Sequence, residues 1–261
     1  MKEVKDNLKE FLEIKNQTET SCDLYFYGDI VSSWWGAWDD TDQYPEAVRD
    51  FLNEAKGKDL NIHVNSGGGS VFAGITIYNM IKNHVGNKIV YIDGLAASIA
   101  SVIALAGDKV IMNTGSSFMI HKPFSWICGN ADDMRKCAED LDVIQNCIMQ
   151  VYKENLNDGV DIKTIEDMVN TETWLTGEEA KEYFNIEVQE NQAIACVSEM
   201  FDKYKNTPNS IKEKYNNLKN ENKTTQNINN VKNNNDDKKD NIEEIKNKEL
   251  KERLQIELDL V

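Results

Sequence analysis

Histidine and cysteine are scarce in this chain, and long apolar runs are missing. The 261 residues include three histidines and five cysteines, none of them in a Cys-x-x-Cys pair. An odd number of scattered cysteines predicts reduced thiols rather than a disulfide framework or a zinc site. No run of 18 apolar residues is present, and the charged start at residues 1–6 does not resemble a signal peptide. We therefore expect a cytoplasmic protein with no membrane segment, metal or cofactor.

Positive charge is also in deficit over most of the chain. The net charge is −16, and residues 201–261 carry +1, which leaves −17 on the first 200 residues (−16 minus +1). Nucleic-acid phosphates would be repelled by such a surface, so direct nucleic-acid binding is not expected. The charge by itself requires nothing beyond solubility.

Three short segments each follow or close an apolar stretch. Asn65–Ser70 reads N-S-G-G-G-S, Gly94–Ser98 reads G-L-A-A-S, and Met119–Pro123 reads M-I-H-K-P. A serine on a tight turn of small residues exposes its hydroxyl, but it needs a base to become a nucleophile. His121 is the candidate base, because His63 in mid-strand and His84 in a polar loop have the positions of structural histidines. Adjacent glycines allow backbone N–H groups to approach a ligand and to stabilise an oxyanion.

The glycine triplet does not match the nucleotide-binding motifs. A P-loop requires Lys and Ser or Thr after its glycines, whereas Ser70-Val71-Phe72-Ala73-Gly74 follows here. The dinucleotide fingerprint Gly-x-Gly-x-x-Gly fails at its third glycine, where Phe72 stands. Both nucleotide interpretations are therefore disfavoured.

Taken together and in this order, the three segments resemble the Clp protease proteolytic subunit (ClpP) family, whose members are serine peptidases. The family reads N-S-P-G-G, then G-x-A-A-S, then M-I-H-x-P, and the resemblance covers about residues 22–200. It implies that Ser98 is the nucleophile and His121 the general base, with the N–H groups of Gly69 and Ile99 forming the oxyanion hole. A peptide substrate would bind as an extended strand along this glycine segment. The substrate-binding residues implied there are Gly68, Ser70 and Val71.

The third member of the implied catalytic triad is a glutamate. Glu172 begins the stretch E-T-W-L-T-G-E-E-A, at the place where the family has Asp. A carboxylate there would orient the imidazole and stabilise the imidazolium. Asp167 is the alternative third member. The E-T-W wording is similar to that of phage and prophage relatives, which mature capsids.

Strands and helices are expected to alternate along the chain. We predict the strands 24–27, 60–64, 88–92, 109–112, 117–121 and 186–188, and the helices from Pro45, 70–82, 98–106, 130–155, 161–170 and 176–184. This alternation predicts an α/β fold with parallel strands and crossover helices. The resemblance makes it the ClpP/crotonase-type repeated β-β-α spiral fold, with 130–155 as the handle helix between stacked rings.

The composition divides the chain into three parts. Residues 1–21 are a polar N-terminal arm, residues 22–200 are the ClpP-like serine protease domain, and residues 201–261 are a polar tail. The tail is rich in Asn, Lys, Asp and Glu, so we expect it to be disordered up to about residue 240. An amphipathic helix at 242–258 is predicted to dock on a partner or to self-associate. Trp34, Trp35 and Trp38 are expected to pack inward or to form a subunit contact.

These observations favour a serine endopeptidase of the phage prohead maturation type. Its substrates would be capsid, portal or scaffold proteins, and the resemblance implies a homo-oligomeric ring, with stacked heptamers as one arrangement. It would work in the cytoplasm of a bacterial host or inside the prohead. The alternatives are a housekeeping ClpP subunit working with an unfoldase ATPase and a non-enzymatic capsid scaffold or adaptor. An acyl-CoA crotonase is disfavoured by the Ser-His pair, and a membrane-bound peptidase with a Lys base by the lack of a membrane segment.

Overall fold

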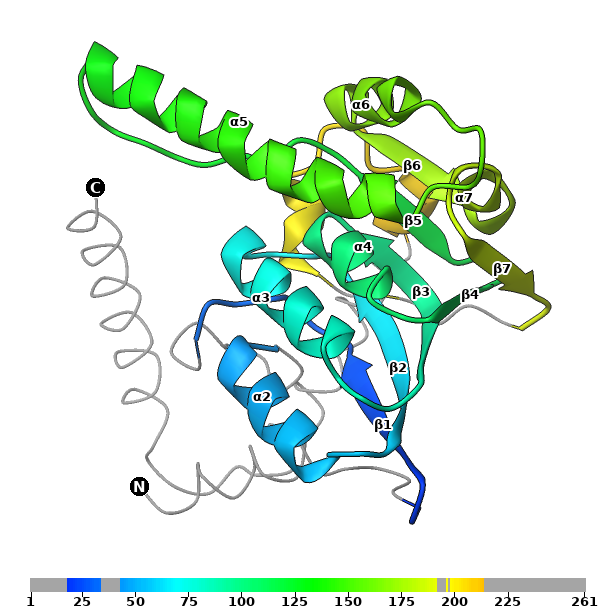
Figure 1. Cartoon of the computed structure of the whole chain (residues 1–261). Helices are drawn as coiled ribbons and strands as arrows, with labels where there is room; N and C mark the ends of the chain where they lie inside the picture. The colour runs from blue at the N-terminus through cyan, green and yellow to red at the C-terminus, as the bar shows by residue number, and fades with distance from the viewer. Residues whose placement is uncertain (1–17, 34–42, 192–195, 197, 214–261) are drawn as a thin grey trace, which may run out of the picture. The chain divides into compact units, whose positions relative to one another are not determined.

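The computed structural model describes residues 18–33, 43–191, 196 and 198–213 (Figure 1). The chain forms two compact units. Among the described residues, the first unit contains those up to Pro123 and those from Gln145 onward, and the second contains Phe124–Ile144. The predictions for Trp34, Trp35 and Trp38, for most of the N-terminal arm and for a helix at 242–258 lie outside the described residues.

The first unit is built on a seven-stranded sheet in which five strands run parallel in the order β1-β2-β3-β4-β7. The predicted α/β fold with parallel strands is confirmed. The observed ends differ from the predicted ones by a few residues, the largest difference being the extension of β3 by five residues. The strands are β1 (Ser21–Phe26), β2 (Asp59–Ser66), β3 (Lys88–Ala97), β4 (Lys109–Asn113) and β7 (Ile186–Gln189).

The long strand β3 has two partners on the same side. Its first half pairs with β4 through Ile89–Ile92, and its last residues, Leu95–Ala97, pair with β5 (Ser117–Ile120). β5 in turn pairs antiparallel with β6 (Thr173–Thr176), a short strand that the sequence did not predict. The carboxyl ends of β2, β3 and β5 and the amino end of β6 therefore meet at one edge of the sheet. In parallel α/β sheets this edge is the usual place for a ligand site.

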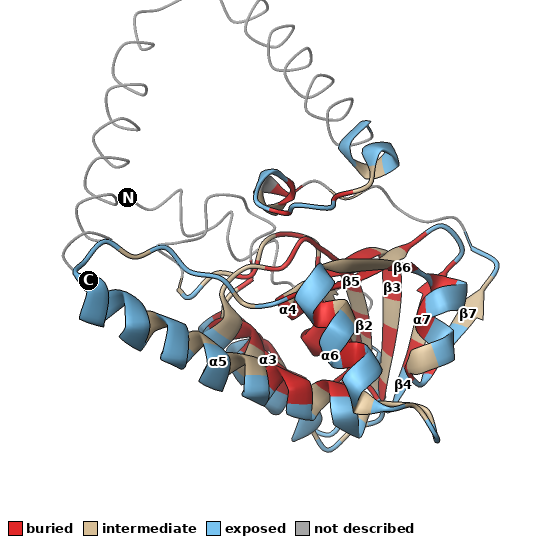
Figure 2. Ribbon diagram, turned by 90° about the horizontal axis from the view of Figure 1, so that it is seen from above, coloured by how far each residue is buried: buried red, intermediate tan, exposed pale blue. Residues whose placement is uncertain are grey.

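One face of the sheet packs on helices. α2 (Pro45–Glu54), α3 (Val71–Lys82) and α4 (Ile99–Ala104) lie on this face (Figure 1). Alternate residues of the strands point toward these helices and are fully buried, among them Phe26, Ile62 and Ile92. Burying apolar side chains of this size contributes roughly 1.5–3 kcal/mol each, so this layer dominates the stability of the unit. Figure 2 shows that the buried residues are concentrated in these strands and helices.

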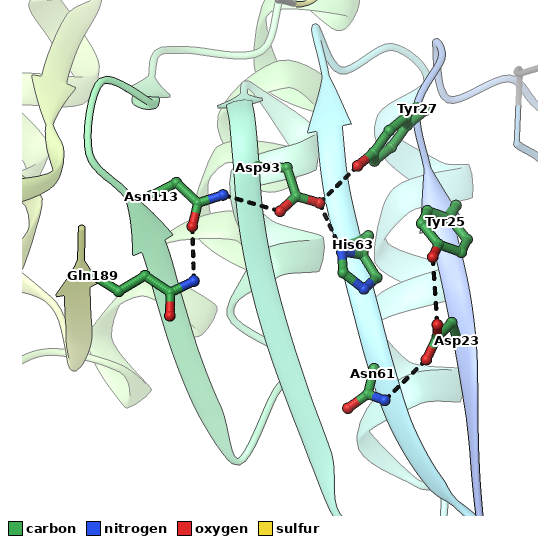
Figure 3. A network of polar contacts seen from close by, with 8 residues as sticks. All are labelled: Asp23, Tyr25, Tyr27, Asn61, His63, Asp93, Asn113 and Gln189. Carbon is green, nitrogen blue, oxygen red and sulfur yellow. Dashed lines mark hydrogen bonds and ion pairs between the residues drawn. The ribbon is translucent and has the colours of Figure 1, made fainter. Parts of the chain in front are cut away.

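The other face of the sheet carries a polar network that runs from the residue after β1 across β2, β3 and β4 to β7 (Figure 3). Asp93, in β3, is at its centre. Its carboxylate accepts hydrogen bonds from Tyr27 Oη (2.8 Å) and Asn113 Nδ2 (3.1 Å), and it lies 2.7 Å from Nδ1 of His63. Gln189 Nε2 then donates to Asn113 Oδ1 at 2.8 Å. The network joins neighbouring strands by their side chains as well as by their backbones.

The remaining helices begin one residue after their predicted starts. α5 spans Ala131–Glu154, α6 spans Ile162–Thr171 and α7 spans Gly177–Tyr183. The capping box at Thr176 and Glu179 is present at the start of α7, as predicted. In the second unit, Asn130 Oδ1 accepts from the amides of Asp132 (2.8 Å) and Asp133 (3.3 Å), which confirms the predicted cap of α5. None of the helices within the described ranges has the length and apolar character needed to span a bilayer.

The beginning of the predicted tail differs from expectation. Composition predicts disorder from residue 201, but residues 198–213 are described and include a short 3-10 helix, η2 (Glu199–Asp202). Phe201 and Tyr204 are only 2% and 5% exposed. These two aromatic side chains bury against Leu95, Ala97 and Met119, and this anchors a segment whose average composition is polar.

Candidate active site

Ser98 stands on a strained turn between β3 and α4. Its φ and ψ are 55° and −126°, in a region that residues other than glycine rarely adopt. The turn is fixed on both sides, because the Ser98 amide donates to the Met119 carbonyl (2.9 Å) and the Ser98 carbonyl accepts from Ser101 Oγ (2.5 Å). Ser101 Oγ is in turn 2.8 Å from the buried hydroxyl of Tyr152, in the last turn of α5. The fold thus holds the serine side chain out at the edge of the sheet.

His121 follows β5 and faces the serine, as predicted. Its Nε2 lies 2.7 Å from Ser98 Oγ. The side chain is buried, and burial lowers the pKa of the imidazole to about 4, while the negative charge of Glu172 acts in the opposite direction. The ring is therefore neutral at pH 7 and can accept the hydroxyl proton. Ser98 and His121 have the geometry expected of a serine and the base that would activate it.

The glycine triplet lies directly against this turn. Gly68 has φ 98°, and a Cβ added to it would be 2.7 Å from the Ala97 carbonyl oxygen and 2.9 Å from Ser98 Cβ. The same position is 3.3 Å from the amide nitrogen of Ile99, the first residue of α4. Only glycine permits this approach. The peptide between Gly68 and Gly69 therefore lies beside the Ile99 amide, so the two predicted oxyanion donors border the same turn.

One edge of the glycine segment is already paired within the chain. The Ile30 amide donates to the Gly68 carbonyl and the Ser70 amide donates to the Ile30 carbonyl, both at 2.7 Å. Val71, the third predicted substrate-binding residue, is the first residue of α3. In extended backbone the groups of neighbouring residues point to opposite edges. The N–H and C=O groups of Gly69 accordingly face away from Ile30.

Glu172 lies beside the site, but its hydrogen bonds go elsewhere. It caps α6 in the left-handed conformation, with φ 53° and ψ 87°. Its two carboxylate oxygens accept from the backbone amides of Lys205 (2.9 Å) and Asn206 (2.6 Å). The effect of Glu172 on His121 is electrostatic, because its charge raises the imidazole pKa against burial. Asp167, the alternative third member, is exposed on α6.

Sequence reasoning missed two aromatic residues that touch the site. Tyr204 donates its hydroxyl hydrogen bond to the Gly67 carbonyl, and its ring lies 5.0 Å from the His121 ring, edge to face. The ring of Trp174, in β6, is 6.0 Å from Tyr204. The signal in the sequence was weak: Phe201 and Tyr204 are an apolar pair three residues apart in a polar stretch.

The other two histidines are structural, as predicted. His63 is bound to Asp93, and its ring is stacked between Tyr25 (4.7 Å) and Tyr91 (5.1 Å). His84 Nε2 lies 2.7 Å from the Lys58 carbonyl oxygen. Across the part of the chain that the structure describes, no three His, Cys, Asp or Glu side chains are grouped so that they could hold a metal ion.

Comparison with known proteins matches residues 48–187 to the family model "Clp protease". The ATP-dependent Clp protease proteolytic subunit of Bacteroides fragilis is 33% identical over 129 residues, which are 49% of this chain and 61% of that protein. The subunit of the same name from Porphyromonas gingivalis is 33% identical over 137 residues, 51% of this chain and 60% of the relative. The chain therefore spans about three fifths of the length of these curated relatives.

A solved structure with the same fold is a mutant of ClpP1 from Listeria monocytogenes. The TM-score is 0.54 at 26% sequence identity, and the match covers 65% of this chain and 91% of that one. The predicted ClpP-like fold is confirmed by this match. The region matched by the family model contains Ser98, His121 and Glu172, whereas residues 198–213 follow it.

Proposed function

The chain belongs to the Clp protease family, and on that premise we propose that it is a serine endopeptidase in which Ser98 is the nucleophile. The observation that carries this proposal is the 2.7 Å contact between Ser98 Oγ and His121 Nε2, made on a strained turn beside the glycine triplet. A neutral imidazole in this position is able to take the serine proton at neutral pH.

The proposed reaction has two acyl-transfer steps. Ser98 Oγ attacks the peptide carbonyl while its proton passes to His121 Nε2, and the N–H groups of Gly69 and Ile99 stabilise the oxyanion. The imidazolium then gives the proton to the leaving amine, and a C–N bond breaks. Water, deprotonated by His121, hydrolyses the acyl-serine and restores the hydroxyl. The negative charge of Glu172 stabilises the imidazolium form of His121.

We place the substrate along the glycine segment as an extended strand. Gly68, Ser70 and Val71 would position it, as the family resemblance implies. Because Ile30 holds the Gly68 carbonyl and the Ser70 amide, the substrate would lie on the opposite edge, where the Gly69 groups and the Gly67 carbonyl are. Main-chain pairing of this kind gives affinity with little dependence on side chains.

For the substrate class, we favour capsid, portal or scaffold proteins in prohead maturation, cleaved by a ring of identical subunits such as stacked heptamers. The support is the E-T-W wording at 172–174 and the long charged extension beyond the family match. Such an enzyme would act in the cytoplasm of a bacterial host or inside the prohead.

A second candidate, favoured by the names of the curated relatives, is a housekeeping proteolytic subunit that works with an unfoldase ATPase. The two candidate functions can be distinguished because they predict different substrates. The full chain would be incubated with the capsid, portal and scaffold proteins encoded in the same genome, and in parallel with casein, with and without a Clp ATPase and ATP. Sedimentation velocity on the same samples would report the size of the assembly.

The maturation proposal predicts discrete cuts in a head protein without ATP, and no cuts by the Ser98→Ala variant. Cleavage of casein only with ATPase and ATP would support the housekeeping role instead. If wild-type and Ser98→Ala proteins were equally inactive in every mixture, and a small fluorophosphonate also failed to label Ser98 in the folded wild-type protein, the chain would be a scaffold or adaptor, and the endopeptidase proposal would be wrong.

A further inference from the structure

A segment of the chain itself lies on the proposed catalytic groove. Residues 198–207, which we call the strap, follow the family match and lie in the same compact unit as Ser98 and His121. Among the described residues the strap pairs with no strand of the sheet, and its only regular element is η2. Its position therefore depends on side-chain and turn contacts rather than on a β-ladder, so it can leave without breaking the sheet.

The aromatic side chains of the strap fill the space next to the serine. Phe201 and Tyr204 pack on Leu95, Ala97 and Met119, with Trp174 against the same cluster. Ala97 and Met119 flank the serine turn directly, because one precedes Ser98 and the other accepts its amide hydrogen bond. The apolar surface beside the nucleophile is thus covered by the chain's own side chains.

The Tyr204 hydroxyl uses a group on the edge where a peptide would pair. It donates to the Gly67 carbonyl, on the glycine segment. Burial raises the pKa of the Tyr204 hydroxyl, and the Ser98 side chain has a smaller effect in the opposite direction. Its ring meanwhile covers one side of His121 at 5.0 Å.

Both ends of the strap are fastened to residues around the site. At one end, Ser198 Oγ donates to Asp29 Oδ1 at 2.6 Å and lies so close to Gly67 that an added Cβ would overlap it. At the other end, the amides of Lys205 and Asn206 bind the Glu172 carboxylate, and Asn206 Nδ2 donates to the Thr171 carbonyl at 2.8 Å. The strap therefore engages the carboxylate of Glu172, whose charge acts on His121.

We propose that the strap is an autoinhibitory segment, which occupies the peptide-binding edge of the groove and has to leave before a peptide substrate binds. This inference rests on the proposed function, because it assigns the regulation of the same site. Ser98 itself is only partly buried, so the strap excludes an extended peptide more than it excludes a small electrophile. When the strap has left the groove in only a fraction of the molecules, the apparent affinity for substrate is the intrinsic affinity multiplied by that fraction.

The experiment compares two probes on the full chain. A small fluorophosphonate measures the reactivity of Ser98, and a fluorogenic peptide measures access to the groove. The variants are Tyr204→Ala, which removes the ring and the bond to Gly67, and Asn206→Ala, which loosens the exposed end of the strap. Tyr183→Ala, a tyrosine of α7 outside the strap contacts, is the matched control, and circular dichroism and the melting temperature report folding.

We expect Tyr204→Ala to raise kcat/KM for the peptide by about tenfold or more and Asn206→Ala by about threefold, since each increases the open fraction. The rate of fluorophosphonate labelling should rise less than peptide cleavage, and Tyr183→Ala should change neither. Removing the Tyr204 ring also admits water to His121, so the acid limb of the pH profile should move upward from about 4 toward the ordinary histidine value near 6.5.

Two results would overturn the inference in distinguishable ways. If folded Tyr204→Ala and Asn206→Ala proteins are labelled normally but cleave peptide no faster, or more slowly, the strap is a supporting part of the site and the proposed function stands. If no folded variant is labelled at all, Ser98 is not an activated nucleophile, and both proposals fail. Should Tyr204→Ala not fold, the exposed Asn206→Ala substitution decides the question.

Discussion

Two of the three histidines, His63 and His121, lie in opposite chemical settings. His63 lies in mid-strand with a carboxylate partner, Asp93, at 2.7 Å and two tyrosine rings stacked on it. His121 lies at a strand end with a serine hydroxyl at 2.7 Å and feels its carboxylate, Glu172, only through charge. By a His–carboxylate criterion alone, His63 would be chosen as the catalytic residue.

The difference between the surroundings of His63 and His121 shows which features indicate a catalytic site. Asp93 and His63 bind each other across neighbouring strands. The rings of Tyr25 and Tyr91 stack on the imidazole, so a reacting group cannot approach His63 from its ring faces. At His121 the partner is the hydroxyl of Ser98, a residue held in a strained conformation at the sheet edge with backbone amides nearby. A strained serine at the end of a strand is therefore stronger evidence of catalysis than a well-bonded histidine in the middle of one.

Replacing each of these two histidines with alanine should give the largest difference in activity between the two settings. We expect His121→Ala to lower kcat/KM for peptide hydrolysis by roughly a thousandfold or more, because the serine loses its base. His63→Ala, the matched control on the other face of the sheet, should keep kcat/KM within about threefold. Comparable losses in the two variants would contradict the assignment of the base.

Removing the charge of Glu172 should have the next largest effect on activity. Glu172→Gln keeps the shape of the side chain but removes the charge that favours the imidazolium. Because no direct carboxylate–imidazole bond is at stake, we expect kcat to fall by about 10–100-fold, less than the roughly 10⁴-fold typical of a directly bonded aspartate. Asp167→Asn is the control and should have no effect. A full loss of activity in Glu172→Gln would show that the carboxylate turns to His121 during the reaction.

The pH profile tests the buried state of His121. Protonation removes its ability to accept the Ser98 proton, so kcat/KM should be flat from pH 8 to about 5 and fall near pH 4. The folded pKa is below the unfolded value near 6.5, so the unfolded state binds more protons between these values and stability is lost as pH falls through this window. An acid limb of the kcat/KM profile with its midpoint near pH 6.5 in the wild-type protein would mean that the His121 imidazole is exposed to water.

The smallest effect concerns stability on the polar face. His63→Ala removes one partner of Asp93 while Tyr27 and Asn113 remain, so the free energy of unfolding should fall by about 1–3 kcal/mol. Urea unfolding with an unchanged m-value would measure it. An unchanged midpoint would mean that the network contributes nothing to folding.

The α/β fold and the proximity of Ser98 and His121 could be predicted from the sequence, because local signals and the family resemblance pointed to both. Alternating apolar strands, the capping box at Thr176 and the small-residue turn before Ser98 act over a few residues. The edge where β2, β3 and β5 end then brings Ser98, Gly68 and His121 together without further information. Strand β6 was missed because the four residues at 173–176 form a strand only by pairing with β5.

The strap was missed for a related reason. Composition averages over many residues, and the stretch after residue 200 is polar on average. Two aromatic residues three positions apart, Phe201 and Tyr204, are enough to anchor it once the surface around Ala97 and Met119 exists. Which carboxylate oxygen binds which amide at Glu172 depends on the same tertiary contacts, so a motif alignment places the residue but does not give its partners.

The central claim, that Ser98 is activated by His121, is tested most directly by intact mass after prolonged treatment with a small fluorophosphonate, followed by peptide mapping. The account predicts one adduct, located on Ser98, in the wild-type and His63→Ala proteins, and none in Ser98→Ala or His121→Ala. An adduct that persists in folded Ser98→Ala, or the absence of any adduct from folded wild-type protein and from Tyr204→Ala, would contradict it.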